Sequence, residues 1–152
     1  MSKIALITGA NRGLGRNTAL RLAEDGVDLI ITYRSNADEA QEVVDEATKL
    51  GRTAVAFRLD VGDLASHEAF RTSVKDALAN RWGRDTFDYL VNNAGTGIYA
   101  TIADTTVEQF DSLLNVHLRG TFFLTQGLIP LLADGGRILN LSTGLARFTK
   151  PG

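Results

Sequence analysis

Three glycines near the N-terminus have the spacing of a phosphate-binding turn. They belong to the segment Thr8-Gly9-Ala10-Asn11-Arg12-Gly13-Leu14-Gly15, which follows an apolar run typical of a strand and precedes a stretch with helical periodicity. Residues without a Cβ atom allow a sharp turn there, and they let a diphosphate approach the free amide groups at the start of the helix. The spacing differs from both the common dinucleotide fingerprint and the P-loop. A glycine-rich turn without a ligand is the alternative interpretation.

The residues after the second predicted strand indicate which dinucleotide would bind. The chain reads Thr32-Tyr33-Arg34-Ser35 there and has no acidic residue before Asp38. Proteins that bind NAD place an acidic side chain in this region to bond the ribose 2′-hydroxyl. Arg34 would instead hold the 2′-phosphate of NADP(H) through paired, charge-assisted hydrogen bonds, and Arg12 could supply a second cation. We therefore expect NADP(H) rather than NAD(H), with solvated surface arginines as the alternative.

Strand-like and helical segments alternate along the chain. Helical periodicity predicts helices over Leu14–Asp25, Asn36–Leu50, about Asp63 to Trp82 and about Thr105 to Leu132, the last opened by a capping box of Thr105 and Glu108. Continuous apolar runs predict strands at Ile4–Thr8, Val27–Thr32, Thr53–Leu59, Phe87–Val91 and Arg137–Ser142. This alternation predicts an α/β fold, a doubly wound parallel sheet with helices on both faces. We expect the Rossmann type, with five strands in the order 3-2-1-4-5. We expect a single domain over residues 1–152, cut short at its C-terminal end.

Composition excludes several classes of protein. The 152 residues are 44% hydrophobic, which argues against a disordered segment, and 16 basic against 18 acidic side chains leave no cationic excess for nucleic acid. The chain has no cysteine, and its two histidines lie far apart, so we expect no metal site. The apolar runs are too short for an export signal or a membrane span. We therefore expect a cytoplasmic protein.

Four further segments, in order, resemble motifs of the short-chain dehydrogenase/reductase family, as the glycine-rich turn also does. They are Asp60-Val61, Asn92-Asn93-Ala94-Gly95 (the family's N-N-A-G), Val116-His117-Leu118-Arg119-Gly120-Thr121-Phe122 and Arg137-Ile138-Leu139-Asn140-Leu141-Ser142-Thr143. The resemblance implies an oxidoreductase that uses a nicotinamide dinucleotide and a small-molecule carbonyl or alcohol substrate. It also implies that Asp60 and Val61 contact the adenine and that Asn92 steadies the strand ends. Asp60 as a helix cap and Asn92 as a turn residue are the structural alternatives.

The cofactor site implied by the glycine-rich turn, the second strand and these motifs is large. Its candidate residues are Thr8, Gly9, Asn11, Arg12, Gly13, Leu14, Gly15, Arg34, Asp60, Val61, Asn92, Ala94 and Gly95.

The resemblance implies a catalytic set of which this sequence holds only a part. Thr143 stands where the family has its substrate-orienting serine, with Ser142 as the alternative, and His117 stands where the family has a helix asparagine. His117 would relay protons, or would be a helical histidine bonded to a carbonyl. None of the three tyrosines is followed by a lysine four residues later, so the family's Tyr-x-x-x-Lys acid is missing, and it would fall just past Gly152. We therefore expect little carbonyl reduction by this chain alone, and a non-catalytic dinucleotide-binding module is the alternative function.

Apolar residues near the predicted sheet edge suggest self-association. The fifth strand would be an edge strand, and Val116, Phe122, Phe123 and Leu124 would lie on an exposed face of the long helix. Uncovered apolar edges pair readily with another chain. We therefore expect a homo-oligomer.

Overall fold

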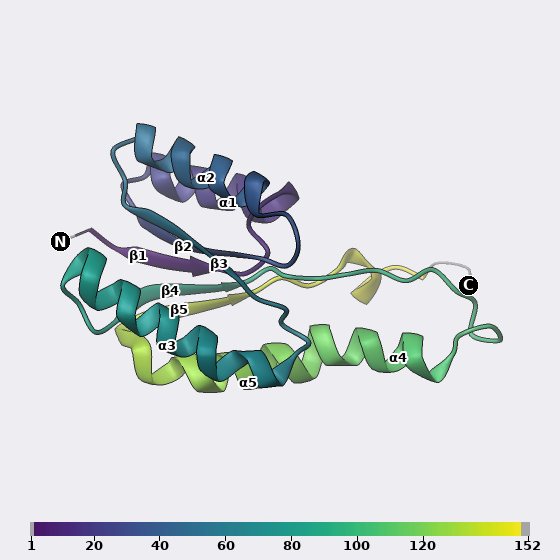
Figure 1. Cartoon of the computed structure of the whole chain (residues 1–152). Coiled ribbons are helices and arrows are strands. Elements are labelled where there is room, and N and C mark those ends of the chain that lie inside the picture. The colour runs from purple at the N-terminus through teal and green to yellow at the C-terminus, as the bar shows by residue number, and fades with distance from the viewer. Residues whose placement is uncertain (1, 150–152) are drawn as a thin grey trace.

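The computed structural model describes residues 2–149, which form a five-stranded parallel sheet (Figure 1); residue 1 and residues 150–152, the ends of the predicted domain, lie outside the described residues. The spatial order is β3-β2-β1-β4-β5, as predicted. It reverses direction between β1 and β4, and ligand crevices form at the carboxyl ends of strands at such a point. The strands are β1 (Ile4–Ile7), β2 (Asp28–Tyr33), β3 (Ala54–Arg58), β4 (Phe87–Asn92) and β5 (Leu132–Asn140).

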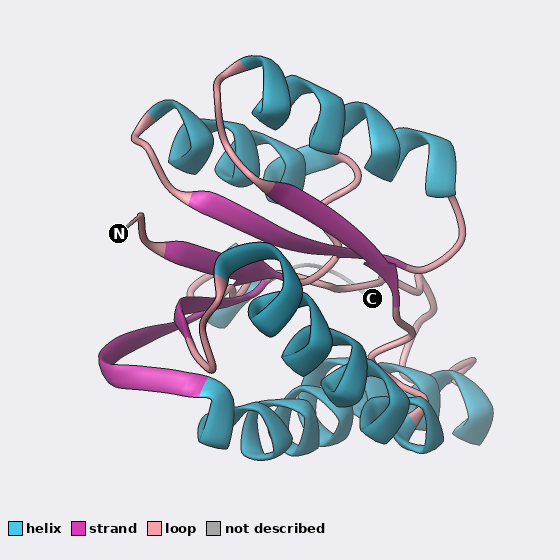
Figure 2. Cartoon of the chain, turned by 60° about the vertical axis from the view of Figure 1, so that its left-hand side comes forward, coloured by secondary structure: helices cyan, strands magenta, loops and turns pink. Residues whose placement is uncertain are grey.

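Helices cover both faces of the sheet (Figure 2). One face carries α1 (Gly13–Glu24) and α2 (Ala37–Lys49), and the other carries α3 (His67–Ala77) and α5 (Thr121–Leu128). A fifth helix, α4 (Val107–Leu114), joins α5 through a π-helical segment, Asn115–Gly120, and extends beyond the sheet (Figure 1). Over residues 2–149, no helix combines the length and the apolar character needed to cross a membrane.

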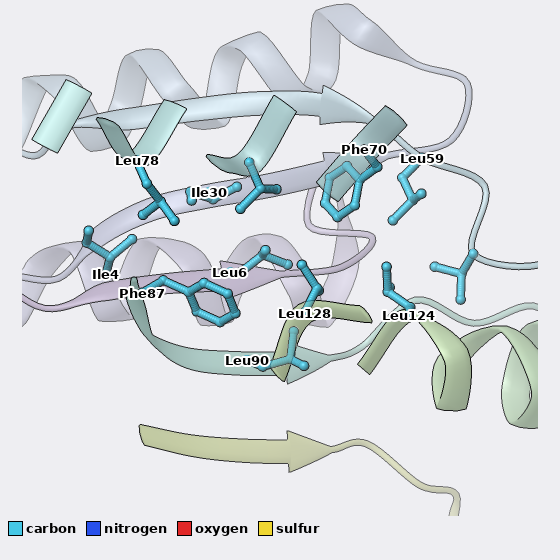
Figure 3. Packing of buried hydrophobic residues seen from close by; sticks show 12 residues of the cluster. Ile4, Leu6, Ile30, Leu59, Phe70, Leu78, Phe87, Leu90, Leu124 and Leu128 are labelled. Atoms are coloured by element: carbon cyan, nitrogen blue, oxygen red, sulfur yellow. The ribbon is translucent and has the colours of Figure 1, made fainter. Parts of the chain in front are cut away.

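The side chains of β1 point alternately into two hydrophobic cores. Ile4 and Leu6 enter the core beneath α3 and α5 (Figure 3), whereas Ala5 and Ile7 enter the core beneath α1 and α2. Neighbouring side chains on a strand face opposite sides of its sheet. A strand covered on both sides is therefore apolar throughout, which explains the continuous apolar runs of the sequence.

The boundary between the long helix and the last strand was predicted wrongly. The helix α5 ends at Leu128, and after a 3-10 turn the strand β5 begins at Leu132, not at Arg137. The start of β5 is irregular, because Phe87 pairs with Leu132 but Tyr89 pairs with Arg137, and Gly135 has a φ of 75°. Because of this bulge, the start of β5 lacks the periodicity of a strand and was not recognised from the sequence. The regular strand also ends earlier than expected, at Asn140.

The start of the predicted long helix is also shifted by one residue. The capping box is formed by Thr106 and Gln109, not by Thr105 and Glu108: the Gln109 amide donates to Thr106 Oγ1 at 3.2 Å, and the Thr106 amide donates to Gln109 Oε1 at 3.1 Å. Thr105 instead donates its hydroxyl to the carbonyl of Thr101. Both residue pairs fit the capping-box pattern. The turn before the helix decides between them.

The apolar surface differs in part from the prediction. The side chains of Phe122 and Phe123 are exposed, and β5 is an edge strand, as expected. Leu124, however, is only 2% exposed, because it belongs to the core beneath α3 and α5. Val116 is half-buried and lies against Gly62. The exposed face of the helix is therefore narrower than predicted.

Candidate functional site

A cavity of about 400 Å³ lies where the strand order reverses. Its walls come from the glycine-rich turn and from the segments that follow β2, β3 and β4. All of the predicted cofactor-binding residues line it except Thr8 and Asn92. The tertiary structure adds residues that the sequence analysis did not select, among them Ser35, Glu39 and Asn93.

The glycine-rich turn leaves open space in front of α1. Gly9 and Gly13 have φ angles of 63° and 59°, in the left-handed region that favours glycine. Apart from Gly13, its chain neighbours and the backbone of α1, no heavy atom of the described residues lies within 4 Å of the position that a Cβ on Gly13 would take. A Cβ on Gly15, by contrast, would lie 2.5 Å from the Gly9 carbonyl oxygen. The N-cap residue of α1, Arg12, forms no side-chain capping bond. The first amides of α1 are therefore available to an anion, and this arrangement fits a diphosphate.

Two buried or half-buried residues fix this turn against the end of β4. Thr8 Oγ1 accepts hydrogen bonds from the amides of Asn93 and Ala94, at 3.0 and 2.9 Å. Asn93 Nδ2 in turn donates to the carbonyls of Thr8 and Gly9, at 2.8 and 3.0 Å. Thr8 is buried and does not line the cavity, so it supports the turn without facing a ligand there. Asn93 is the second asparagine of the N-N-A-G motif, and this motif is the sequence feature from which the contact could have been predicted.

The preceding residue, Asn92, joins three elements. Its Nδ2 donates to Thr125 Oγ1 of α5 at 3.0 Å and to Asn140 Oδ1 of β5 at 2.8 Å. Asn92 is therefore a buried cross-link between β4, β5 and α5, and it is the last residue of β4.

Asp60, which also lines the cavity, follows the end of β3. Its Oδ1 accepts a hydrogen bond from the Gly62 amide at 3.0 Å. The helix-cap alternative for Asp60 is wrong, because Asp63 is the N-cap of the next turn and accepts from the Ala65 amide. Asp60 instead remains exposed on the cavity wall.

Two arginine side chains give the cavity a cationic rim. Arg12 and Arg34 are exposed, and within residues 2–149 neither side chain forms an ion pair. Arg58 Nε donates to the carbonyl of Arg34 at 3.2 Å, so the last residue of β3 holds the loop after β2 in place. Glu39 lines the same cavity, and its Oε2 accepts a hydrogen bond from Asn11 Nδ2 at 2.6 Å. Two cations, Arg12 and Arg34, and two carboxylates, Glu39 and Asp60, therefore line the cavity.

The catalytic candidates lie apart from this rim. His117, in the π-helical segment, places Nε2 2.7 Å from the Thr96 carbonyl oxygen, and its ring lies against Gly95. It also lines a second cavity, of about 490 Å³, between α5 and the ends of β4 and β5. Thr143 Oγ1 accepts from the Leu145 amide at 3.2 Å and caps a 3-10 turn. In the described part of the chain, neither Ser142 nor Thr143 lines either cavity, and neither is hydrogen-bonded to His117.

Comparison with known proteins places this site in a family. The family model described as short chain dehydrogenase matches residues 3–152. The chain belongs to the short-chain dehydrogenase/reductase family of oxidoreductases. Among family members, it is 38% identical over 147 residues to the hydroxynaphthalene reductase-like protein Arp2 of Metarhizium brunneum, a match that covers 97% of this chain and 53% of Arp2.

Solved structures of the family have the same fold. The landomycin C-6 ketoreductase LanV, solved with bound NADP and rabelomycin, superposes with a TM-score of 0.94 at 35% identity, covering 98% of this chain and 61% of LanV. A short chain dehydrogenase from Burkholderia cenocepacia J2315, solved in complex with NADP, gives a TM-score of 0.86 at 39% identity, covering 99% of this chain and 59% of that one. The chain thus spans about half the length of the curated relatives it matches and about three fifths of these solved chains.

Proposed function

We propose that this chain binds NADP(H) in the cavity at the strand switch point. It would be the cofactor-binding part of an oxidoreductase of the short-chain dehydrogenase/reductase type that acts on a carbonyl/alcohol pair. One observation carries the choice of cofactor. Arg12 and Arg34 lie on the rim of the cavity without an ion pair in residues 2–149, and no acidic side chain ends β2. A carboxylate at the end of β2 would favour the 2′-hydroxyl of NAD, whereas free guanidinium groups favour a 2′-phosphate.

Different residues of the cavity bind different parts of the cofactor. The amides at the start of α1, at Gly13, Leu14 and Gly15, hold the diphosphate, helped by the helix dipole. Arg12 and Arg34 hold the 2′-phosphate through charge-assisted hydrogen bonds. When bound, the nicotinamide supplies or accepts the hydride.

The walls of the site complete this arrangement. Asp60 and Val61 would contact the adenine, and Ala94 and Gly95 also line the cavity. Asn92 keeps the ends of β4 and β5 together.

The substrate would meet the cofactor beyond Gly95 and Thr96. In this proposal, Thr143 or Ser142 orients the carbonyl oxygen and His117 relays a proton. The contact of His117 Nε2 with the Thr96 carbonyl holds the ring at the boundary between the two cavities, which supports a place for it next to the nicotinamide. The two solved relatives, one of them a ketoreductase, were crystallised with NADP, which supports the choice of cofactor and of a ketone-type substrate.

A direct titration tests the cofactor assignment. We expect the protein to bind NADPH about tenfold more tightly than NADH, because hydrogen bonds to charged groups contribute about 1.5–3 kcal/mol. The Arg34→Ala variant should lose most of that preference by weakening NADPH alone, as measured by nucleotide fluorescence. Arg81→Ala removes an exposed arginine in the segment after α3 and serves as the control. Equal affinity of the native chain for both nucleotides, or a preference for NADH, would contradict the proposal.

A further inference from the structure

The carboxylate of Glu39 shares the cavity rim with two guanidinium groups but pairs with neither. Its Oε2 instead accepts a hydrogen bond of 2.6 Å from the neutral amide of Asn11. Elsewhere between α1 and α2 the chain forms an ordinary ion pair, because Arg16 Nη2 lies 2.6 Å from Glu46 Oε1. The interface between these helices can therefore satisfy a glutamate with an arginine, yet at the cavity it uses an asparagine.

The local structure places Glu39 at the start of α2 and its carboxylate beside Asn11. Glu39 lies in the first turn of α2, and its amide donates to Oδ1 of the N-cap residue Asn36 at 3.3 Å. This end of α2 directly follows the loop that carries Arg34. Asn11 belongs to the glycine-rich turn, 28 residues away in sequence. The hydrogen bond therefore fastens the carboxylate to the turn.

A free carboxylate on this rim would oppose a 2′-phosphate in two ways. It would attract Arg12 or Arg34 into an ion pair and so mask the cation, and it would repel the phosphate directly. A neutral donor satisfies the carboxylate without consuming a positive charge. The contact thus engages Glu39, one of the two acidic residues of the cavity, without using either arginine.

We infer that Asn11 is a positioning residue for cofactor selectivity. It holds Glu39 on the glycine-rich turn and thereby keeps Arg12 and Arg34 free for the 2′-phosphate. The inference rests on the proposed binding of NADP(H), and it gives Asn11 a role other than direct contact with the cofactor. If Asn11 contacted the diphosphate that NADPH and NADH have in common, its loss would weaken both nucleotides equally.

A double-mutant cycle tests the inference by the ratio of two dissociation constants. Asn11→Ala should raise the dissociation constant of NADPH by up to about fivefold, the scale of an exposed ion pair, while that of NADH changes by less than about twofold. Glu39→Gln should not weaken NADPH, because it removes the charge that Asn11 restrains. The variant with both substitutions should regain the native ratio, since no carboxylate is left to mask the arginines.

The control variant is Gln41→Ala, which removes another amide–carboxylate hydrogen bond on α2. Gln41 Nε2 donates to Asp45 Oδ1 at 2.8 Å on the exposed side of the helix, outside the cavity. This variant should leave the ratio unchanged.

Three results would overturn the inference, and they are distinguishable. Equal weakening of NADPH and NADH in Asn11→Ala would mean that Asn11 is a direct ligand or only supports the fold. A loss in Asn11→Ala that Glu39→Gln does not restore would mean that Glu39 is not the group being restrained. A native chain that binds neither nucleotide would refute the proposed function itself, and the inference with it.

Discussion

At the scale of single residues, Asp88 shows how a buried charge can be stabilised at the end of the sheet opposite the cavity. It is 3% exposed and accepts hydrogen bonds from Lys3 Nζ, the Ile4 amide and Arg84 Nη1, at 2.8, 2.9 and 3.0 Å. Burial alone would raise the pKa of Asp88, but the hydrogen bonds from these donors outweigh it and lower the pKa below its ordinary value of 3.8. The ionised carboxylate therefore stabilises the native structure.

The lowered pKa gives this contribution a defined pH dependence. It is fully present above the unfolded-state pKa, near 3.8, and is lost as the pH falls through the lower pKa of the folded state. We expect Asp88→Asn to lower the free energy of unfolding by about 2 kcal/mol at neutral pH and by less in acid, as measured by urea unfolding at both pH values. Asp85→Asn, at an exposed position, should have little effect. A loss in Asp88→Asn that is the same at both pH values would contradict this account.

At the scale of elements, the three helices that follow β1, β2 and β4 begin differently. The helix α2 has an asparagine cap and α4 has a complete capping box, whereas α1 has no side-chain cap. Capping side chains satisfy the free amides of a first turn. The uncapped start of α1 faces the cavity, and a ligand there would take the place of the missing cap.

The register of the capping box at α4 can be tested by two neighbouring substitutions. Thr106→Ala removes the acceptor of the Gln109 amide and should destabilise the first turn of α4 by about 1 kcal/mol. Thr105→Ala, one residue earlier, should cost less. Because α4 has no buried residue, global unfolding would report this change poorly, and amide hydrogen exchange within α4 is the suitable measurement. Faster exchange in Thr105→Ala than in Thr106→Ala would contradict the register.

At the scale of the whole molecule, the two edges of the sheet differ in burial. The strand β3 at one edge is half-buried for most of its length, whereas most of β5 at the other edge is exposed. Leu139 of β5 is 55% exposed, and the exposed phenylalanines Phe122 and Phe123 come from neighbouring α5. An apolar edge strand with unpaired backbone groups is a template for pairing with another chain.

We therefore expect the chain to self-associate through β5 and the exposed face of α5. Sedimentation velocity over a range of concentrations should show species larger than a monomer, and Leu139→Lys should reduce them, because an exposed lysine opposes edge-to-edge pairing. Leu50→Lys, at the exposed end of α2 and away from this edge, is the matched control. A monodisperse monomer at high concentration would refute this expectation.

The sequence by itself determined the features that depend on local physics. The parallel α/β sheet follows from alternating strands and helices joined by right-handed crossovers, and the buried strands are recognisable because they are apolar on both faces. The place of the cavity follows from Gly9, Gly13 and Gly15, since a positive φ and a missing Cβ are properties of the residue itself.

Only the tertiary structure decided which distant residues meet. The contact of Asn11 with Glu39 joins positions 28 apart, and that of Asn92 with Asn140 joins positions 48 apart. The burial of Leu124 likewise depends on α3, and the early start of β5 depends on its pairing with β4. Periodicity and propensity describe a segment on its own. Side-chain partners across elements are set by how those elements pack, which no single segment encodes.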